Sequence, residues 1–182
     1  NGQIGGIYWT PFTDWARDPE RTVDAAPEYK YKDIYLYANG KPQELDGAYA
    51  VDPTHPAVEA MMKKTSGLFH RAGFEYVKMD FMTHGAMEAD RWYNPEIKTG
   101  IQGYNYGMKL LNQYFGDMYI NLSISPVFPA QYAQSRRIAC DAWNQIKDTE
   151  YTLNALSYGW WQKYIYQYND ADHIVLRDAT DG

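Results

Sequence analysis

The sequence lacks the residues from which several common sites are built. It has one cysteine, Cys140, which excludes an internal disulfide and a cysteine-based zinc site. Its four histidines, at positions 55, 70, 84 and 173, show no metal-binding spacing such as a pair four residues apart. The glycines at 100, 103 and 107 are not followed by the Lys-Ser/Thr pair of a phosphate-binding loop. These absences argue against a metal centre and a nucleotide-binding loop.

Basic residues and long apolar runs are also scarce. The 182 residues include 17 Lys and Arg against 23 Asp and Glu, a net charge of -6, and no basic run exceeds two residues. Nucleic-acid binding needs a basic surface that neutralises phosphates, so we expect no nucleic-acid partner. Because no stretch approaches about 18 consecutive apolar residues, we expect no membrane partner either. We expect any export signal to lie outside this chain.

Aromatic residues, in contrast, are abundant. The chain has 18 tyrosines and 6 tryptophans, which is more than a core alone requires. Such rings either rim pockets and interfaces or act as stacking platforms for sugars and bases. The acidic balance of the chain favours sugars over bases.

Hydrophobic periodicity and turn residues predict that strands and helices alternate along the chain. The helix that ends near Gly73 begins either at Asp52-Pro53 or at His55-Pro56, because proline is tolerated only near a helix start. Two glycines in the next helix, Gly103 and Gly107, predict close packing against a neighbour. The predicted strands span 4–9, 74–80, 117–123 and 173–176, a hairpin with an Asn39-Gly40 turn spans 33–50, the helices span 53–73, 99–115 and 143–156, and 135–141 is either a strand or a turn.

This alternation predicts an α/β fold in which crossover helices connect the strands of a parallel sheet. Long polar loops follow the strands, which favours a barrel whose active site lies at the carboxyl ends of its strands. A closed eight-stranded barrel typically needs about 250 residues, more than the 182 present.

Three aspartates, Asp80, Asp141 and Asp172, lie at the ends of predicted strands. A barrel brings such positions to one pocket, and two carboxyl groups across a glycosidic bond are the minimal equipment for its hydrolysis. Lys78 and Asp80 share one face of a strand, and the ammonium would keep the carboxylate charged, as a nucleophile requires.

Asp141 is the candidate general acid, because burial beside Trp143 would help it to keep its proton. Arg137 stands four residues earlier and is assigned to sugar hydroxyls, since contact with a guanidinium would oppose that protonation. Each carboxylate also has a structural alternative, because an aspartate at a strand end is commonly a turn former or a helix cap. A further alternative is a barrel enzyme that uses Lys78 as an amine nucleophile on a carbonyl substrate.

Four motifs occur in the order of a known group of enzymes. Each motif alone is weak, but together they span nearly the whole chain and resemble the signatures of the α-galactosidase-like clan of glycoside hydrolases, most closely families 27 and 36. The motifs are Gly6-Ile7-Tyr8, Tyr76-Val77-Lys78-Met79-Asp80, Arg137-x-x-x-Asp141 and Asn169-Asp170-Ala171-Asp172.

The resemblance implies a (β/α)8 catalytic domain with a retaining, double-displacement mechanism and no metal or organic cofactor. Asp80 would be the nucleophile and Asp141 the acid/base. The resemblance also implies a secreted or periplasmic protein that cleaves terminal α-galactosides. The implied substrate-binding residues are Lys78, Arg137, Asp172, Trp9 and Asp170.

Two departures from the family pattern leave the sugar open, and a third, at Ala171, matters little. Trp9-Thr10 stands where an acidic residue often follows Gly-Ile-Tyr, Asn121-Leu122-Ser123 replaces a glutamate of the fifth strand, and Ala171 replaces a proline. The alternative substrates are an α-N-acetylgalactosaminide, a β-L-arabinopyranoside and an α-glucoside.

The length of the chain is the other departure. The order of the motifs matches about strands two to seven of the barrel, so we expect residues 1–182 to be a partial catalytic domain in contact with other parts of the same polypeptide. A carbohydrate-binding barrel fragment without activity is the alternative from a different functional class.

Overall fold

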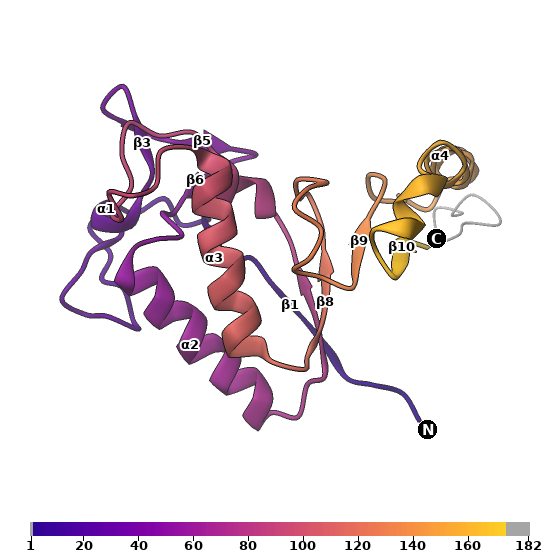
Figure 1. Ribbon diagram of the computed structural model, residues 1–182, viewed down its shortest axis with the longest axis horizontal. Coiled ribbons are helices and arrows are strands. Elements are labelled where there is room, and N and C mark those ends of the chain that lie inside the picture. The colour runs from indigo at the N-terminus through magenta and orange to yellow at the C-terminus, as the bar shows by residue number, and fades with distance from the viewer. Residues whose placement is uncertain (1, 174–182) are drawn as a thin grey trace, which may run out of the picture.

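The computed structural model describes residues 2–173 and places five parallel strands in one sheet beside three main helices (Figure 1). Neighbouring strands run β1-β7-β8-β9-β10 across the sheet. The predicted α/β fold with a parallel sheet is therefore confirmed. The strands are β1 (Gly6–Trp9), β7 (Tyr76–Met79), β8 (Tyr119–Leu122), β9 (Ser135–Arg137) and β10 (Tyr168–Asp170).

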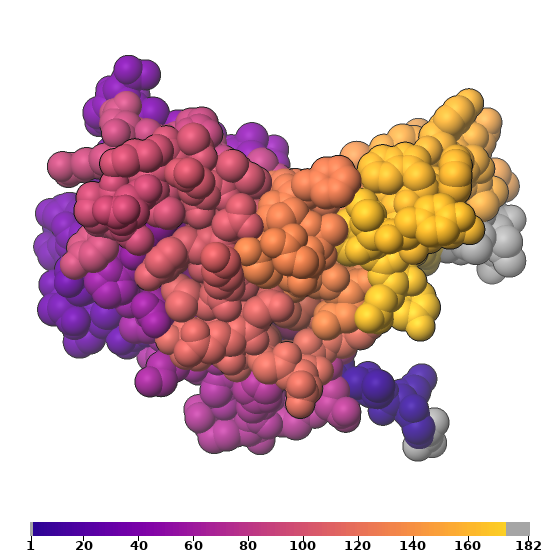
Figure 2. Space-filling view, in the orientation of Figure 1, coloured from indigo at the N-terminus to yellow at the C-terminus, as the bar shows by residue number. Residues whose placement is uncertain are grey.

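The sheet is open within the described residues. Its edges are β1 and β10, which do not pair with one another. Figure 2 shows the segment of α4 (Ile146–Tyr158) and β10 as an arm that projects beyond the main body of the molecule. The parallel strands within residues 2–173 therefore do not form a closed barrel.

The outer face of the sheet packs against α2 (Pro56–Arg71) and α3 (Gly100–Phe115), which lie side by side (Figure 1). The register sets Ile7 beside Val77 and Val77 beside Ile120, so one apolar row faces the helices. The helices contribute Met62, Phe69, Met108, Leu111 and Phe115 to the buried core.

The ends of these helices follow from local sequence. His55 caps α2, because its Nδ1 accepts a hydrogen bond from Ala57 N at 3.1 Å and Pro56 occupies the first helical position. The His55-Pro56 start is therefore correct. Thr99 and Gln102 form a capping box at the start of α3.

The close packing predicted at the two helical glycines is confirmed. A methyl group on Gly103 would lie 2.9 Å from Trp92 Nε1, and one on Gly107 would lie 2.7 Å from Pro53 Cβ. Glycine at these positions lets α3 approach the loops that precede α2 and α3.

Between β1 and α2 the chain forms two small antiparallel hairpins, where one was predicted. The Asn39-Gly40 turn is confirmed, with φ of +52° and +73°. A second turn of the same kind, Asp46-Gly47, divides the following segment into two strands. The elements of this region are β2 (Thr13–Asp14), α1 (Tyr31–Ile34), β3 (Tyr37–Ala38), β4 (Lys41–Pro42), β5 (Glu44–Leu45) and β6 (Ala48–Ala50).

The C-terminal elements differ from the prediction. The ambiguous segment forms β9, and α4 begins at Ile146 because Asp148 Oδ2 accepts hydrogen bonds from the backbone of Trp143 and Gln145. The last strand within residues 2–173 is β10, where Ile138 N donates to Asp170 O at 3.0 Å. Backbone pairing with β9 thus selects residues 168–170. In the predicted strand 173–176, His173 is outside any strand and the remaining positions lie outside the described residues.

Two further short helices are η1 (Met82–Ala86) and η2 (Trp160–Tyr164). Among residues 2–173, no helix has both the length and the apolar character needed to cross a bilayer.

Candidate active site

A cleft of about 710 Å³ opens at the carboxyl ends of β7, β8 and β9. It contains both predicted catalytic aspartates together with the two basic residues predicted to bind sugar hydroxyls. Parallel strands bring these distant positions together, as the sequence predicts. Its principal lining residues are Tyr8, Lys78, Asp80, Ser123, Arg137, Asp141, Trp143 and Tyr151.

Asp80 is the most firmly held carboxylate of the cleft. It follows β7 directly, its backbone N donates to Trp9 O at 2.9 Å, and its Oδ1 accepts from Phe81 N at 2.8 Å. The residue is only 8% exposed. A carboxylate fixed at a strand end and open to one cleft can attack a bound electrophile from a defined direction.

Tyr8 lies beside Asp80 and was missed by the sequence analysis. Burial, the charge of Asp80, a hydrogen bond with Asp80 and the charge of Asp141 raise the pKa of Tyr8 to about 12. The phenol therefore stays protonated at neutral pH and can donate to the carboxylate. The i, i+2 alternation between Gly6 and Tyr8 on a strand is the signal that could have placed this ring on the inner face.

Lys78 lies on the same face, 5.9 Å from the ring centre of Tyr8. Among residues 2–173, no ion pair joins Lys78 to Asp80. The prediction that Lys78 and Asp80 share one face is correct, but the neighbour of the Lys78 ammonium is the Tyr8 ring.

Arg137 connects two acidic residues of the site. Its Nη2 lies 2.9 Å from Asp141 Oδ1 and 3.3 Å from Asp172 Oδ2, and its side chain is 4% exposed. Burial favours a raised pKa for Asp172, but a hydrogen bond from Ala142 N and the charges of Arg137, His173 and Lys78 together lower it. Asp172 is thus an ionised anchor for the guanidinium.

Two expectations for Asp141 are wrong. Its side chain is 57% exposed and Trp143 is 73% exposed, so aromatic burial does not enclose the carboxyl group. Arg137 contacts Asp141, whereas the prediction assigns that arginine to sugar hydroxyls and keeps it away from the acid. The reason is that β9 ends at Arg137 and the chain turns back, which returns Asp141 to the guanidinium.

Trp9 and Asp170 do not line this cleft. The Trp9 ring stacks on Phe115 at 5.9 Å and contacts Phe69 edge-on at 6.4 Å, on the helical side of the sheet. Its assignment to substrate is therefore corrected to a core residue. On the inner face, Asp170 Oδ2 accepts from Asn121 Nδ2 at 2.7 Å beneath the cleft, and its Oδ1 accepts from Asp172 N at 2.9 Å. Asp170 therefore positions Asp172.

Several residues after the strands adopt left-handed backbone conformations. Phe81, Ile124 and Asp172 have φ of +54°, +42° and +70°. A β-branched residue such as Ile124 rarely occupies this region, and such conformations concentrate at functional sites. No group of three metal-ligating side chains occurs within the described part of the chain.

The arrangement of strands and cleft can be compared with known proteins. No protein-family model matches the chain, and no curated protein matches it in sequence. Solved structures do match. The fold of this chain is similar to that of α-galactosidases.

The α-galactosidase TtGalA of Thermus thermophilus, solved with p-nitrophenyl α-D-galactopyranoside and with stachyose, aligns over 94% of this chain with a TM-score of 0.71 and 20% identity. A GH27 β-L-arabinopyranosidase of Geobacillus stearothermophilus aligns over 100% of the chain, with a TM-score of 0.61 and 18% identity, and covers 42% of that enzyme. The GH36 α-galactosidase AgaA of the same organism aligns over 91% of the chain, with a TM-score of 0.54 and 14% identity, and covers 23% of that enzyme. The chain spans 37% of TtGalA in its p-nitrophenyl galactoside complex and 39% in its stachyose complex.

Proposed function

We propose that residues 1–182 are part of a (β/α)8 catalytic domain of a retaining glycoside hydrolase that cleaves terminal α-galactosides. The observation that supports this most strongly is the presence of Asp80 and Asp141 in one cleft at the carboxyl ends of parallel strands. The fold similarity to α-galactosidases is consistent with the proposal. The open sheet would be completed by other parts of the same polypeptide.

In the proposed first step, the Asp80 carboxylate attacks the anomeric carbon while Asp141 gives a proton to the departing glycosidic oxygen. The C–O bond to the aglycone breaks and a glycosyl ester forms on Asp80. In the second step Asp141 removes a proton from water, whose oxygen attacks the anomeric carbon and releases Asp80. The sugar leaves with its original anomeric configuration.

The remaining polar residues support this cycle. Tyr8 donates to Asp80 and orients it, and Lys78 offers donors to sugar hydroxyls. Arg137 has two acidic partners, so protonation of Asp141 leaves the guanidinium paired with Asp172. Asp141 can therefore alternate between acid and base without leaving a buried cation unpaired.

The decisive experiment compares two variants on p-nitrophenyl α-galactopyranoside and on stachyose. Asp80→Ala should lower the rate on both substrates by more than about a thousandfold, because a nucleophile has no substitute. Asp141→Ala should lower the rate of stachyose hydrolysis far more than the rate of aryl galactoside hydrolysis, since nitrophenolate leaves without protonation. Asp117→Ala, at an exposed aspartate before β8, is the control. Asp80→Ala activity within tenfold of the unchanged protein would refute the assignment.

A β-L-arabinopyranoside is the second candidate substrate, favoured by the similarity to the arabinopyranosidase fold. Arabinopyranose corresponds to galactose without its C6 hydroxymethyl group. The ratio of kcat/KM on the two aryl glycosides separates these candidates. A related α-glycosidase should instead prefer an aryl α-N-acetylgalactosaminide or α-glucoside. Galactose binding without turnover of any of these would indicate a binding fragment.

A further inference from the structure

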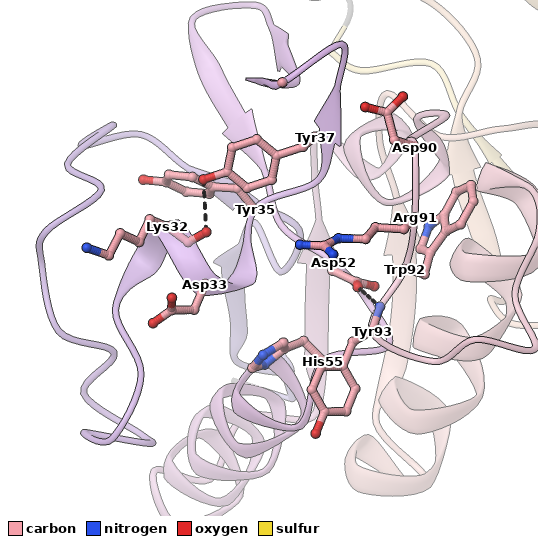
Figure 3. Close-up of a pocket in the computed structure, with 11 residues that line it drawn as sticks. Lys32, Asp33, Tyr35, Tyr37, Asp52, His55, Asp90, Arg91, Trp92 and Tyr93 are labelled. Atoms are coloured by element: carbon pink, nitrogen blue, oxygen red, sulfur yellow. Dashed lines mark hydrogen bonds between the residues drawn. The ribbon is translucent and has the colours of Figure 1, made fainter.

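A second hollow lies apart from the cleft, between the hairpin region and the loop that precedes α3 (Figure 3). Its volume is about 850 Å³, and it shares no lining residue with the cleft. We call it the Tyr37–Tyr93 hollow, after aromatic residues contributed by its two walls. Its size is within the range of small-molecule sites, about 300–1,000 Å³.

Hydrogen bonds between the two walls hold the hollow open. Asp90 N donates to Tyr37 O at 2.8 Å, and Tyr93 N donates to Asp52 Oδ2 at 2.6 Å. Asp52 is 5% exposed, and its Oδ1 also accepts from Thr54 N at 2.8 Å. The hollow is therefore preformed, which lowers the entropic cost of binding a ligand.

Aromatic surface lines the hollow. Figure 3 shows the rings of Tyr37 and Tyr93 on different walls, with the side chain of Arg91 extending between them. Tyr93 is 57% exposed, and His55 meets its ring edge-on at 4.6 Å. An exposed ring that is supported from one side gives a flat, rigid contact surface.

Two charged side chains of the hollow, Asp90 and Arg91, are available for hydrogen bonds with a ligand. Among residues 2–173, neither the Asp90 carboxylate nor the Arg91 guanidinium has a hydrogen bond or ion pair, whereas Lys32 is paired with Glu20 at 2.8 Å. One free anion and one free cation suit a ligand that both donates and accepts hydrogen bonds and has no charge of its own. The faces of a sugar ring are apolar and can contact the aromatic rings. Its hydroxyl groups both donate and accept hydrogen bonds, so a sugar suits the hollow.

We propose that the Tyr37–Tyr93 hollow is a second binding site for a neutral oligosaccharide. Binding at this site does not depend on the proposed function, but the use of the site does. The site would hold a glycan chain while one end of that glycan occupies the cleft. Arg91 and Asp90 bind hydroxyl groups, and Tyr93 stacks on a sugar ring.

The test is affinity electrophoresis of the protein in gels with galactomannan, a neutral polymer with α-galactosyl branches. The double variant Arg91→Met/Tyr93→Ala should weaken retardation at least about tenfold in apparent Kd, the combined effect of a lost ring contact and lost charge-assisted hydrogen bonds. Tyr158→Ala is the matched control, because Tyr158 is 84% exposed at the end of α4, outside the hollow. An unchanged Kd in the double variant would overturn the proposal.

Two additional measurements make the result specific. The thermal midpoint of the double variant should stay within about 2 °C of the unchanged protein, since both side chains are exposed. An acidic polymer, polygalacturonate, should bind at least tenfold more weakly than galactomannan, and tighter binding of that polymer would overturn the assignment to neutral glycans. If the unchanged protein binds galactomannan through Arg91 and Tyr93 but hydrolyses no aryl galactoside, the proposed function fails and the second site stands.

Discussion

Replacing Arg137 by methionine tests the ionic network of the cleft. Methionine keeps most of the apolar stem but removes the charge, the hydrogen bonds to Asp141 Oδ1 at 2.9 Å and Ala139 O at 3.2 Å, and the ion pair with Asp172 Oδ2 at 3.3 Å. Asp172 would retain the hydrogen bond from Ala142 N at 2.8 Å. Its Oδ1 would also keep the contact with His173 Nδ1 at 3.3 Å, so the change removes the buried cationic partner of Asp172 but leaves both of its oxygens with a neighbour.

The size of the effect follows from the exposure of the partners. Breaking a buried ion pair costs about 3–5 kcal/mol, whereas an exposed pair contributes about 0.2–1 kcal/mol. Asp141 is 57% exposed and belongs to the second kind, while Asp172 is 21% exposed and is intermediate. We expect a loss of about 2 kcal/mol at pH 7, which corresponds to a decrease of roughly 4–8 °C in the thermal midpoint.

The loss should depend on pH in a defined direction. Because the folded pKa of Asp172 is lowered, its contribution to stability is complete above its unfolded pKa of about 3.9 and disappears as the pH falls through the folded pKa. Denaturant unfolding of both proteins at pH 7, 5 and 3 should therefore show a difference that shrinks in acid. A difference that stays constant from pH 7 to pH 3 would refute the reasoning. Arg17→Met, which removes a half-exposed pair with Glu44, should cost less than about 1 kcal/mol.

Two further substitutions test the site and the packing behind it. Tyr8→Phe should lower kcat on an aryl galactoside by about tenfold or more, since a hydrogen bond to a charged group contributes about 1.5–3 kcal/mol. With the pKa of Tyr8 at about 12, the ratio of the two proteins' rates should be constant from about pH 5 to pH 8, and a ratio that changes there would contradict the assigned donor. Gly107→Ala should destabilise the protein by about 1–2 kcal/mol in denaturant unfolding, because overpacking against Pro53 exceeds the gain in helix propensity. Gly67→Ala in α2 is the control and should stabilise it, since a methyl group there meets only the end of the Arg71 side chain.

The parallel sheet and its main helices could be predicted because each has a strong local signal. Proline at the start of α2, the capping box of Thr99 and the apolar rows of β7 and β8 all agree with the tertiary structure. The second hairpin turn has an equally clear signal in Asp46-Gly47, which the prediction of a single hairpin leaves out.

Strand β10 is an element that hydrophobic periodicity does not predict. Residues 168–170 pair with β9 through backbone hydrogen bonds, whereas the predicted strand at 173–176 lies outside the described residues except for His173. Tyr168 is 65% exposed on the open face, so this strand has little of the burial that makes a strand recognisable in sequence. Pairing with a partner strand is a nonlocal interaction that a single window of sequence does not contain.

The assignment of Trp9 to the site and the omission of Tyr8 have one cause. A strand alternates its side chains, so an error of one position exchanges the core face for the inner face. Both residues are aromatic, and composition alone does not distinguish them. The neighbouring strand would have resolved the choice, because Tyr8 is in register with Lys78 and Trp9 with Met79. A site residue on β1 must share the face of Lys78, which selects Tyr8.

The position of Asp141 could not be obtained in this way, because it lies beyond the strand. Asp80 follows β7 directly and its direction is set by the sheet, whereas three residues separate Asp141 from β9. Its place is set by Arg137, and Arg137 is in turn held by Asp172, which belongs to a segment far along the chain. A carboxylate oriented by such a network moves when any member is lost. Substitution of Arg137, the last residue of β9, should therefore disturb the proposed acid/base more than the proposed nucleophile, because Asp141 pairs with the guanidinium whereas Asp80 is held by backbone contacts with Trp9 and Phe81.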